Sequence, residues 1–197
     1  MMDIFAIAVT LFLIMDPLGN IPMFLSVLKN VKPERRRPVL LRELIIALCL
    51  MLLFLFSGPS LLKILGLTPA AVAIGGGVVL MIIAIRMIFP LRNHSAMSEE
   101  EEENEEPLLV PLATPLIAGP SLLATIILLR QSSSSPIHLL IAIFIAWGIS
   151  CAILLYAQNL YRILGTRGLK AIERLMGMIL ICVSVQMLLN GFLPLLK

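Results

Sequence analysis

Six long apolar runs, separated by short polar segments, make up most of this chain of 197 residues. The runs cover residues 4–29, 40–58, 68–90, 108–129, 137–157 and 174–194. Each has about 19 residues or more, which as an α-helix is enough to cross the roughly 30 Å hydrocarbon core of a bilayer. Because that core offers no water to unpaired backbone groups, helix is the expected state of each run. The sequence therefore predicts an all-α, polytopic membrane protein with six transmembrane helices.

The composition excludes most soluble classes of protein. Apolar residues make up 59% of the chain and charged residues 14%, and the mean hydropathy is +1.03. A soluble domain has about 45–50% apolar and about 25% charged residues. A soluble enzyme, a nucleic-acid binder and a disordered chain are therefore excluded. The three cysteines lie singly within apolar runs, so we expect neither a disulfide nor a metal site.

Most of the lysines and arginines lie on one side of the predicted bundle. With six spans, the connections 1–2, 3–4 and 5–6 share a side, and with the adjoining helix ends they hold twelve of the 15 basic residues. Basic residues mark the cytoplasmic side, so both termini are expected outside the cytoplasm. If the first and fourth runs were re-entrant hairpins instead, the bias would fall to ten against five. We prefer six spans.

The two halves of the chain resemble each other. Segments 15–25 and 113–123 align at an offset of 98 residues, with two prolines at matching positions in each. The same offset superimposes the second run on the fifth, and an offset of 101 superimposes the third on the sixth. We therefore expect two three-helix repeats, residues 1–90 and 108–197, joined by an acidic cytoplasmic linker at 91–107. Because each repeat has an odd number of spans, the second is expected to be inverted, as in many secondary transporters.

Prolines interrupt the first helix of each repeat. Pro17 and Pro22 in the first repeat, and Pro115 and Pro120 in the second, lack the N–H group that a helix would use. New half-helices are expected to begin near Pro22 and Pro120. If their N-termini face each other near the membrane midplane, their free N–H groups would form a site for an anion or a carboxylate.

Asp16 is the only acidic residue deep within an apolar run, whereas Glu43 lies near the end of its run. A carboxylate within the bilayer costs several kcal/mol unless it is paired, protonated or facing water. One interpretation of Asp16 is a site for a substrate amine, a cation or a proton. The other is a helix cap, because Asp-Pro followed by Gly-Asn is typical of a turn. Small polar residues lie beside the same breaks at Asn20, Thr114 and Ser121.

Two further features concern packing and catalysis. The glycines at 75–77 and 177 are expected to allow close helix packing rather than to contact substrate. The chain lacks the motifs of serine hydrolases, zinc metalloproteases and phosphate-binding loops. We therefore expect no enzyme activity and no cofactor.

Three segments are similar to the MarC family of bacterial inner-membrane proteins: residues 16–22 (DPLGNIP), 114–120 (TPLIAGP) and 173–177 (ERLMG). The resemblance covers nearly the whole chain. It implies a six-helix, multi-pass plasma-membrane protein in a superfamily with amino-acid exporters, and some relatives are classed as neutral amino-acid transporters. The predicted substrate- or ion-binding set consists of the positions that match the family's motifs and the polar residues beside the breaks. That set is Asp16, Pro17, Gly19, Asn20, Pro22, Thr114, Pro115, Gly119, Pro120 and Ser121.

The leading hypothesis is a secondary transporter of small zwitterionic solutes such as neutral amino acids, working by alternating access at a midplane site, with export as one direction. The expected partners are the small-molecule substrate, H⁺ or Na⁺, membrane lipids and a second copy in a homo-oligomer, but no nucleic acid. Uncoupled efflux is equally compatible with the sequence. Two alternatives stay open, a lipid-carrier translocase and a membrane scaffold or regulator that transports nothing.

Overall fold

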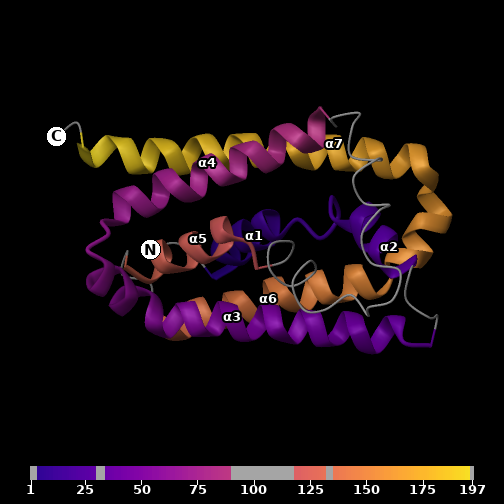
Figure 1. Ribbon diagram of the computed structural model, residues 1–197, viewed down its shortest axis with the longest axis horizontal. Helices are drawn as coiled ribbons and strands as arrows, with labels where there is room; N and C mark the ends of the chain where they lie inside the picture. Colours follow the sequence, from indigo (N-terminus) through magenta and orange to yellow (C-terminus); the bar gives the residue numbers. More distant parts are fainter. Residues whose placement is uncertain (1–3, 30–33, 90–117, 132–134, 196–197) are drawn as a thin grey trace, which may run out of the picture.

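The computed structural model describes residues 4–29, 34–89, 118–131 and 135–195. Every regular element in these residues is a helix (Figure 1). The helices are α1 (Ile4–Met15), α2 (Ile21–Lys29), α3 (Arg36–Leu65), α4 (Pro69–Ile88), α5 (Pro120–Gln131), α6 (Pro136–Leu155) and α7 (Ala157–Phe192), followed by the 3-10 turn η2 (Leu193–Leu195). The predicted linker at 91–107 lies outside the described residues.

In the described ranges, four helices, α3, α4, α6 and α7, are long and apolar enough to cross a membrane. They correspond to the second, third, fifth and sixth predicted spans. The helices α1 and α5 are apolar but have only 12 residues each. At 1.5 Å per residue, each is about 18 Å long and too short to cross the hydrocarbon core alone. The prediction of an all-α membrane protein is thus confirmed, while the arrangement of six spans stays a prediction.

Local sequence explains where several helices begin, end or bend. The first residue of α4 is Pro69, and the hydroxyl of Thr68 just before it accepts a hydrogen bond from the N–H of Ala71 (3.2 Å). At the end of α3, Gly66 adopts the left-handed conformation, φ 65°, that commonly ends a helix. In α7, Gly165 has φ 63° and ψ 179°, and the helix axis turns there.

The structure differs from the prediction at residues 158–173, which were expected to connect the last two spans. This segment is helical and belongs to α7, which continues across the bend to Phe192. It contains no proline, and nine of its 16 residues are Leu, Arg, Lys, Ala, Gln or Glu, which favour helix. In Figure 1 the first part of α7 crosses the right-hand end of the bundle before the helix turns back along it.

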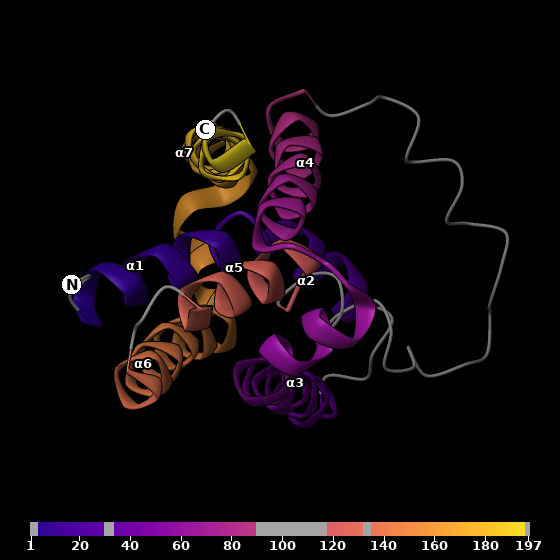
Figure 2. The same ribbon diagram turned by 90° about the vertical axis from the view of Figure 1, so that its left-hand side faces the viewer.

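The helices form three layers, which are clearest in the end-on view of Figure 2. The long part of α7 packs against α4 in one layer, and α3 contacts α6 in the opposite one. Between them lie the short helices: α1 packs on α6, and α5 packs against both α4 and α3. The hydrophobic core includes side chains from all three layers, among them Leu11, Leu44, Leu80, Ile126 and Ile143. The broken segments therefore occupy the interior of the molecule.

Glycines allow α4 to approach its neighbours closely. A β-carbon at Gly76 would lie 2.9 Å from the Cβ of Ala124 on α5, and one at Gly177 would lie 3.1 Å from the carbonyl oxygen of Ala84. Such approaches between helices are typical of small residues in membrane proteins. Gly75 has nothing within 4 Å of its β-carbon position. The packing prediction is therefore confirmed at Gly76 and Gly177 and wrong for Gly75, which faces outward.

Candidate functional site

The first helix of the chain breaks between α1 and α2, where the sequence predicts a break. Helix α1 ends at Met15, and α2 begins at Ile21 with Pro22 as its second residue. The prediction that a new half-helix begins near Pro22 is therefore confirmed. The intervening turn is held by its own polar groups, since the side-chain amide of Asn20 donates a hydrogen bond to the carbonyl of Met15 (3.1 Å).

Asp16 organises this turn. Its backbone has φ 43°, a left-handed conformation that Asp and Asn tolerate better than other residues with a β-carbon. Its Oδ1 accepts a hydrogen bond from the N–H of Gly19 (3.0 Å), and its carbonyl oxygen accepts one from the N–H of Asn20 (3.1 Å). One oxygen of the Asp16 carboxylate, Oδ1, therefore caps the turn, as the capping interpretation expects.

The other oxygen of Asp16 has no such partner. The residue is only 3% exposed, and within the described part of the chain Oδ2 makes no hydrogen bond. A buried polar atom without a partner costs about 1–3 kcal/mol, and more when it is charged. Glu173 on α7 is near enough for its charge to act on Asp16. A proton, a cation or a substrate amine at Oδ2 would remove this cost.

The backbone donors at this break are largely used within the turn. The N–H of Gly19 donates to Asp16, as described, and that of Ile21 donates to the carbonyl of Leu18 (3.3 Å). A β-carbon at Gly19 would collide with the Asp16 carboxylate and with the methyl group of Met87. The predicted cluster of free N–H groups is therefore not found at these positions. Gly19 and Pro17 are both buried within the turn itself.

The second break is described from Ala118 onward, so Thr114 and Pro115 lie outside the described residues. Helix α5 begins at Pro120, as the sequence predicts, and the carbonyl of Gly119 accepts its first backbone hydrogen bond. The buried hydroxyl of Ser121 donates to the carbonyl of Gly76 on α4 (2.9 Å). This hydrogen bond therefore connects α5 with α4.

The structure places the two breaks at different levels along α4. Gly19 lies against Met87, whereas Ser121 lies against Gly76. These two α4 residues are eleven positions apart, which corresponds to about 16 Å along a helix. The predicted set therefore divides into a group around Asp16 and a group at the start of α5. Among the described residues, the two groups do not converge on one small solute, and the part they play in binding stays a prediction.

A second buried carboxylate belongs to Glu43 on α3, which the sequence reasoning assigned to the end of a span. Glu43 is 1% exposed, and its Oε1 pairs with the half-exposed guanidinium of Arg42 at 3.1 Å. Its Oε2 is buried and has no hydrogen-bond partner among the described residues. Helical spacing could have found it, because Glu43 falls on the apolar face formed by Leu40, Leu44 and Ala47.

Residues next to the two buried carboxylates contact the same part of α6. The indole N–H of Trp147 donates to the carbonyl of Leu44 (2.8 Å), the residue after the α3 carboxylate. The hydroxyl of Ser150 lies 3.8 Å from the sulfur of Met15, the residue before the carboxylate at the helix break. Trp147 and Ser150 are three positions apart, so residues adjoining the two acidic residues meet the same part of α6. In the described residues no three His, Cys, Asp or Glu side chains gather as metal ligands would.

Comparison with known proteins identifies the family. A family model described as MarC family integral membrane protein matches residues 1–196. This chain therefore belongs to the MarC family, and it is an integral membrane protein.

Relatives match over nearly their whole length. The chain is 48% identical to the UPF0056 inner membrane protein YhgN of Escherichia coli strain K12 over 192 residues, which are 97% of this chain and 96% of the relative. A UPF0056 membrane protein of Buchnera aphidicola subsp. Baizongia pistaciae has the same identity and coverage. A UPF0056 membrane protein of Pyrococcus abyssi is 35% identical and covers 93% of this chain and 90% of its own. No solved structure matches the chain. These names describe membrane proteins without stating a substrate.

Proposed function

We propose that this chain is a secondary transporter of small zwitterionic solutes such as neutral amino acids. The observation that carries the proposal is Asp16, a buried carboxylate at a helix break whose Oδ2 has no partner among the described residues. Intramembrane carboxylates of this kind are costly, and in transporters they bind ions, protons or substrate. The description of the Escherichia coli relative as an inner membrane protein supports the same location for this chain. The distribution of basic residues is the argument for placing both termini in the periplasm.

Binding at Asp16 would use the positive group of the solute or of the coupling ion. A substrate ammonium, H⁺ or Na⁺ would satisfy Oδ2 without breaking the bond that Oδ1 accepts from Gly19. Glu43 on α3 has a second buried oxygen without a partner among the described residues, Oε2, and it is a second candidate for binding the coupling ion. The carboxylate of the solute would need donors from elsewhere, since the N–H groups of this turn are largely used.

The contacts between helices support alternating access by two inverted repeats. At the repeat offsets, α4 corresponds to the long part of α7 and α3 corresponds to α6, and each of these pairs is in contact. A twofold relation in the membrane plane would produce this pattern. Rocking of one repeat against the other would then expose the central broken helices to each side in turn.

Flux measurements in proteoliposomes test the proposal. Wild-type protein should move a radiolabelled neutral amino acid, and a pH or Na⁺ gradient should drive its accumulation. Asp16→Asn should abolish the gradient-driven part, whereas Glu34→Gln, which removes an exposed carboxylate, should not change it. Absence of flux for every neutral amino acid would contradict the proposal. If the protein instead reorients a labelled lipid carrier, the result would support a translocase. If it shows neither activity, the result would support a scaffold.

A further inference from the structure

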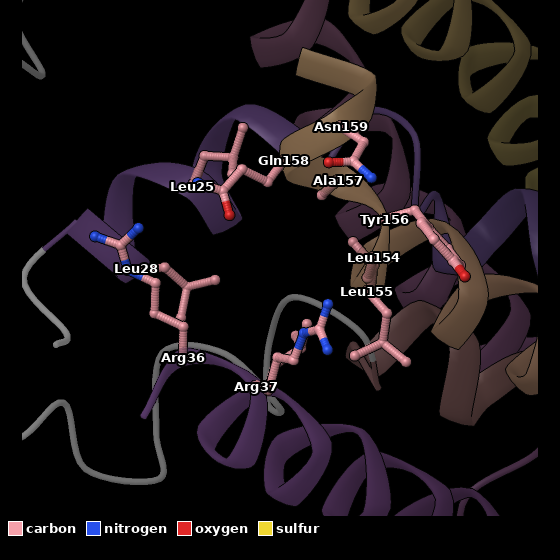
Figure 3. A pocket seen from close by; sticks show the side chains of 11 residues that line it. Leu25, Leu28, Arg36, Arg37, Leu154, Leu155, Tyr156, Ala157, Gln158 and Asn159 are labelled. Carbon is pink, nitrogen blue, oxygen red and sulfur yellow. The ribbon is translucent and has the colours of Figure 1, made fainter. Parts of the chain in front are cut away.

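A small cavity lies at one end of the bundle, away from the buried carboxylates (Figure 3). It has a volume of about 110 Å³ and lies where α2, the start of α3, the end of α6 and the start of α7 meet. Its lining combines an apolar surface with charged and polar groups. The apolar lining residues are Leu25, Leu28, Leu40, Leu154, Leu155 and Ala157.

The polar groups come from two helices on opposite sides of the cavity. Arg36 and Arg37 lie at the start of α3, and Gln158 and Asn159 lie at the start of α7. Figure 3 shows the guanidinium of Arg37 pointing into the hollow, with Gln158 on the far side. Residues 34–37 hold three arginines and one glutamate, so the rim is positively charged. Guanidinium and carboxamide N–H groups together suit the oxygens of a phosphate group.

The surroundings place this cavity at the membrane–water interface. The first part of α7 crosses the end of the bundle before it turns at Gly165 (Figure 1). Tyr156, just before this segment, and Tyr161 within it are 63% and 41% exposed, and Arg162 is also exposed. Tyrosines are enriched at the level of the lipid headgroups, and arginines at the cytoplasmic face. The phosphate groups most available to the cavity are therefore those of lipids.

We propose that this cavity binds the headgroup of an anionic phospholipid. The phosphate would accept hydrogen bonds from Arg37, Gln158 and Asn159, and the first part of an acyl chain would cover Leu25 and Leu28 on α2. Basic pockets between transmembrane helices bind anionic headgroups by this combination of charge and apolar contact. The site is independent of transport at Asp16, and its occupant is a lipid from the surrounding leaflet rather than the transported solute.

Lipid titration of the purified full chain, followed by native mass spectrometry, tests the proposal. The probes are phosphatidylglycerol, phosphatidylcholine with the same acyl chains, and inorganic phosphate. Phosphatidylglycerol should bind at least about tenfold more tightly than phosphatidylcholine, and Arg37→Gln should weaken it about tenfold or more, as expected for a lost charged hydrogen bond. Arg162→Gln removes an equally charged residue of the same interface outside the cavity. It should weaken binding at most about fivefold, the effect of one surface charge.

Other outcomes would overturn the proposal. Equal weakening by Arg37→Gln and Arg162→Gln would mean that only general surface charge attracts the lipid. Equal binding of the two lipids, or displacement of phosphatidylglycerol by the same concentration of inorganic phosphate, would also contradict a phospholipid site. If Arg37→Gln does not fold, Gln158→Leu removes a donor at nearly constant volume and should weaken phosphatidylglycerol severalfold, with Gln131→Leu at the other end of the bundle as its control. Equal effects of these two leucine variants would refute the site.

Discussion

Substitutions of Asp16 can separate its role in the turn from the role of its charge. Asparagine keeps an oxygen that can accept from the N–H of Gly19, and it tolerates the backbone φ of 43°. Glycine fits the backbone but leaves that buried N–H without a partner, which costs about 1–2 kcal/mol. Alanine loses the acceptor and adds left-handed strain of about 1–2 kcal/mol, so it should cost about 2–4 kcal/mol relative to asparagine.

The comparison among the variants does not depend on the charge, because all three remove it. Thermal unfolding in detergent should rank asparagine above glycine and glycine above alanine. For a chain of this size, the alanine variant should unfold roughly 5–15 °C below the asparagine variant. Asp16→Asn should unfold at or above the temperature of the wild type, because it removes an acidic group whose Oδ2 is buried without a partner.

Proteoliposome flux then reports on the charge. If Oδ2 binds the amine or the coupling ion, Asp16→Asn should abolish gradient-driven flux although the protein is stably folded. Normal flux with an unchanged pH dependence would mean that Asp16 is only part of the turn, which would refute the proposed role. Equal stability of the alanine and asparagine variants would refute the structural reasoning instead, since neither the Gly19 hydrogen bond nor the left-handed backbone would then matter.

Further predictions concern packing, the second carboxylate and topology. Gly76→Ala should lower the free energy of unfolding by about 1–3 kcal/mol, because the new β-carbon would lie 2.9 Å from two neighbouring side chains. Gly75 faces open space, so Gly75→Ala should be neutral or stabilising by up to about 1 kcal/mol. Thermal unfolding of the two variants checks both values. Glu43→Gln should fold normally but weaken the gradient-driven flux, and an unchanged flux would show that Glu43 has only a structural role. A reporter that is active only outside the cytoplasm should be active after Lys197 and silent near Glu101, and the opposite pattern would contradict the orientation inferred from charge.

The positions of the helices and of their breaks could be predicted from the sequence, because both depend on short segments. The length of an apolar run predicts a membrane helix wherever the run lies in the bundle. Likewise, proline lacks its N–H in any surroundings, and helices begin at Ile21 and Pro120, where the prolines predict them. The turn at Asp16 is equally local, since its hydrogen bonds join residues of the same short segment.

The burial of Glu43 and the separation of the two breaks depend on how the helices pack. A glutamate near the end of an apolar run can face lipid, water or a neighbouring helix, and here the packing of α3 against its neighbours buries it. Gly75 and Gly76 are adjacent in sequence, but only Gly76 faces α5, because successive helical residues point about 100° apart.

The level of each break along α4 is likewise a result of packing between segments far apart in the chain. Gly19 and Ser121 are about a hundred residues apart, and each meets α4 through contacts that no local pattern encodes. The symmetry of the repeat predicts matching breaks, but it does not predict their separation along α4. That separation depends on the depth at which each short helix packs between the two layers of long helices.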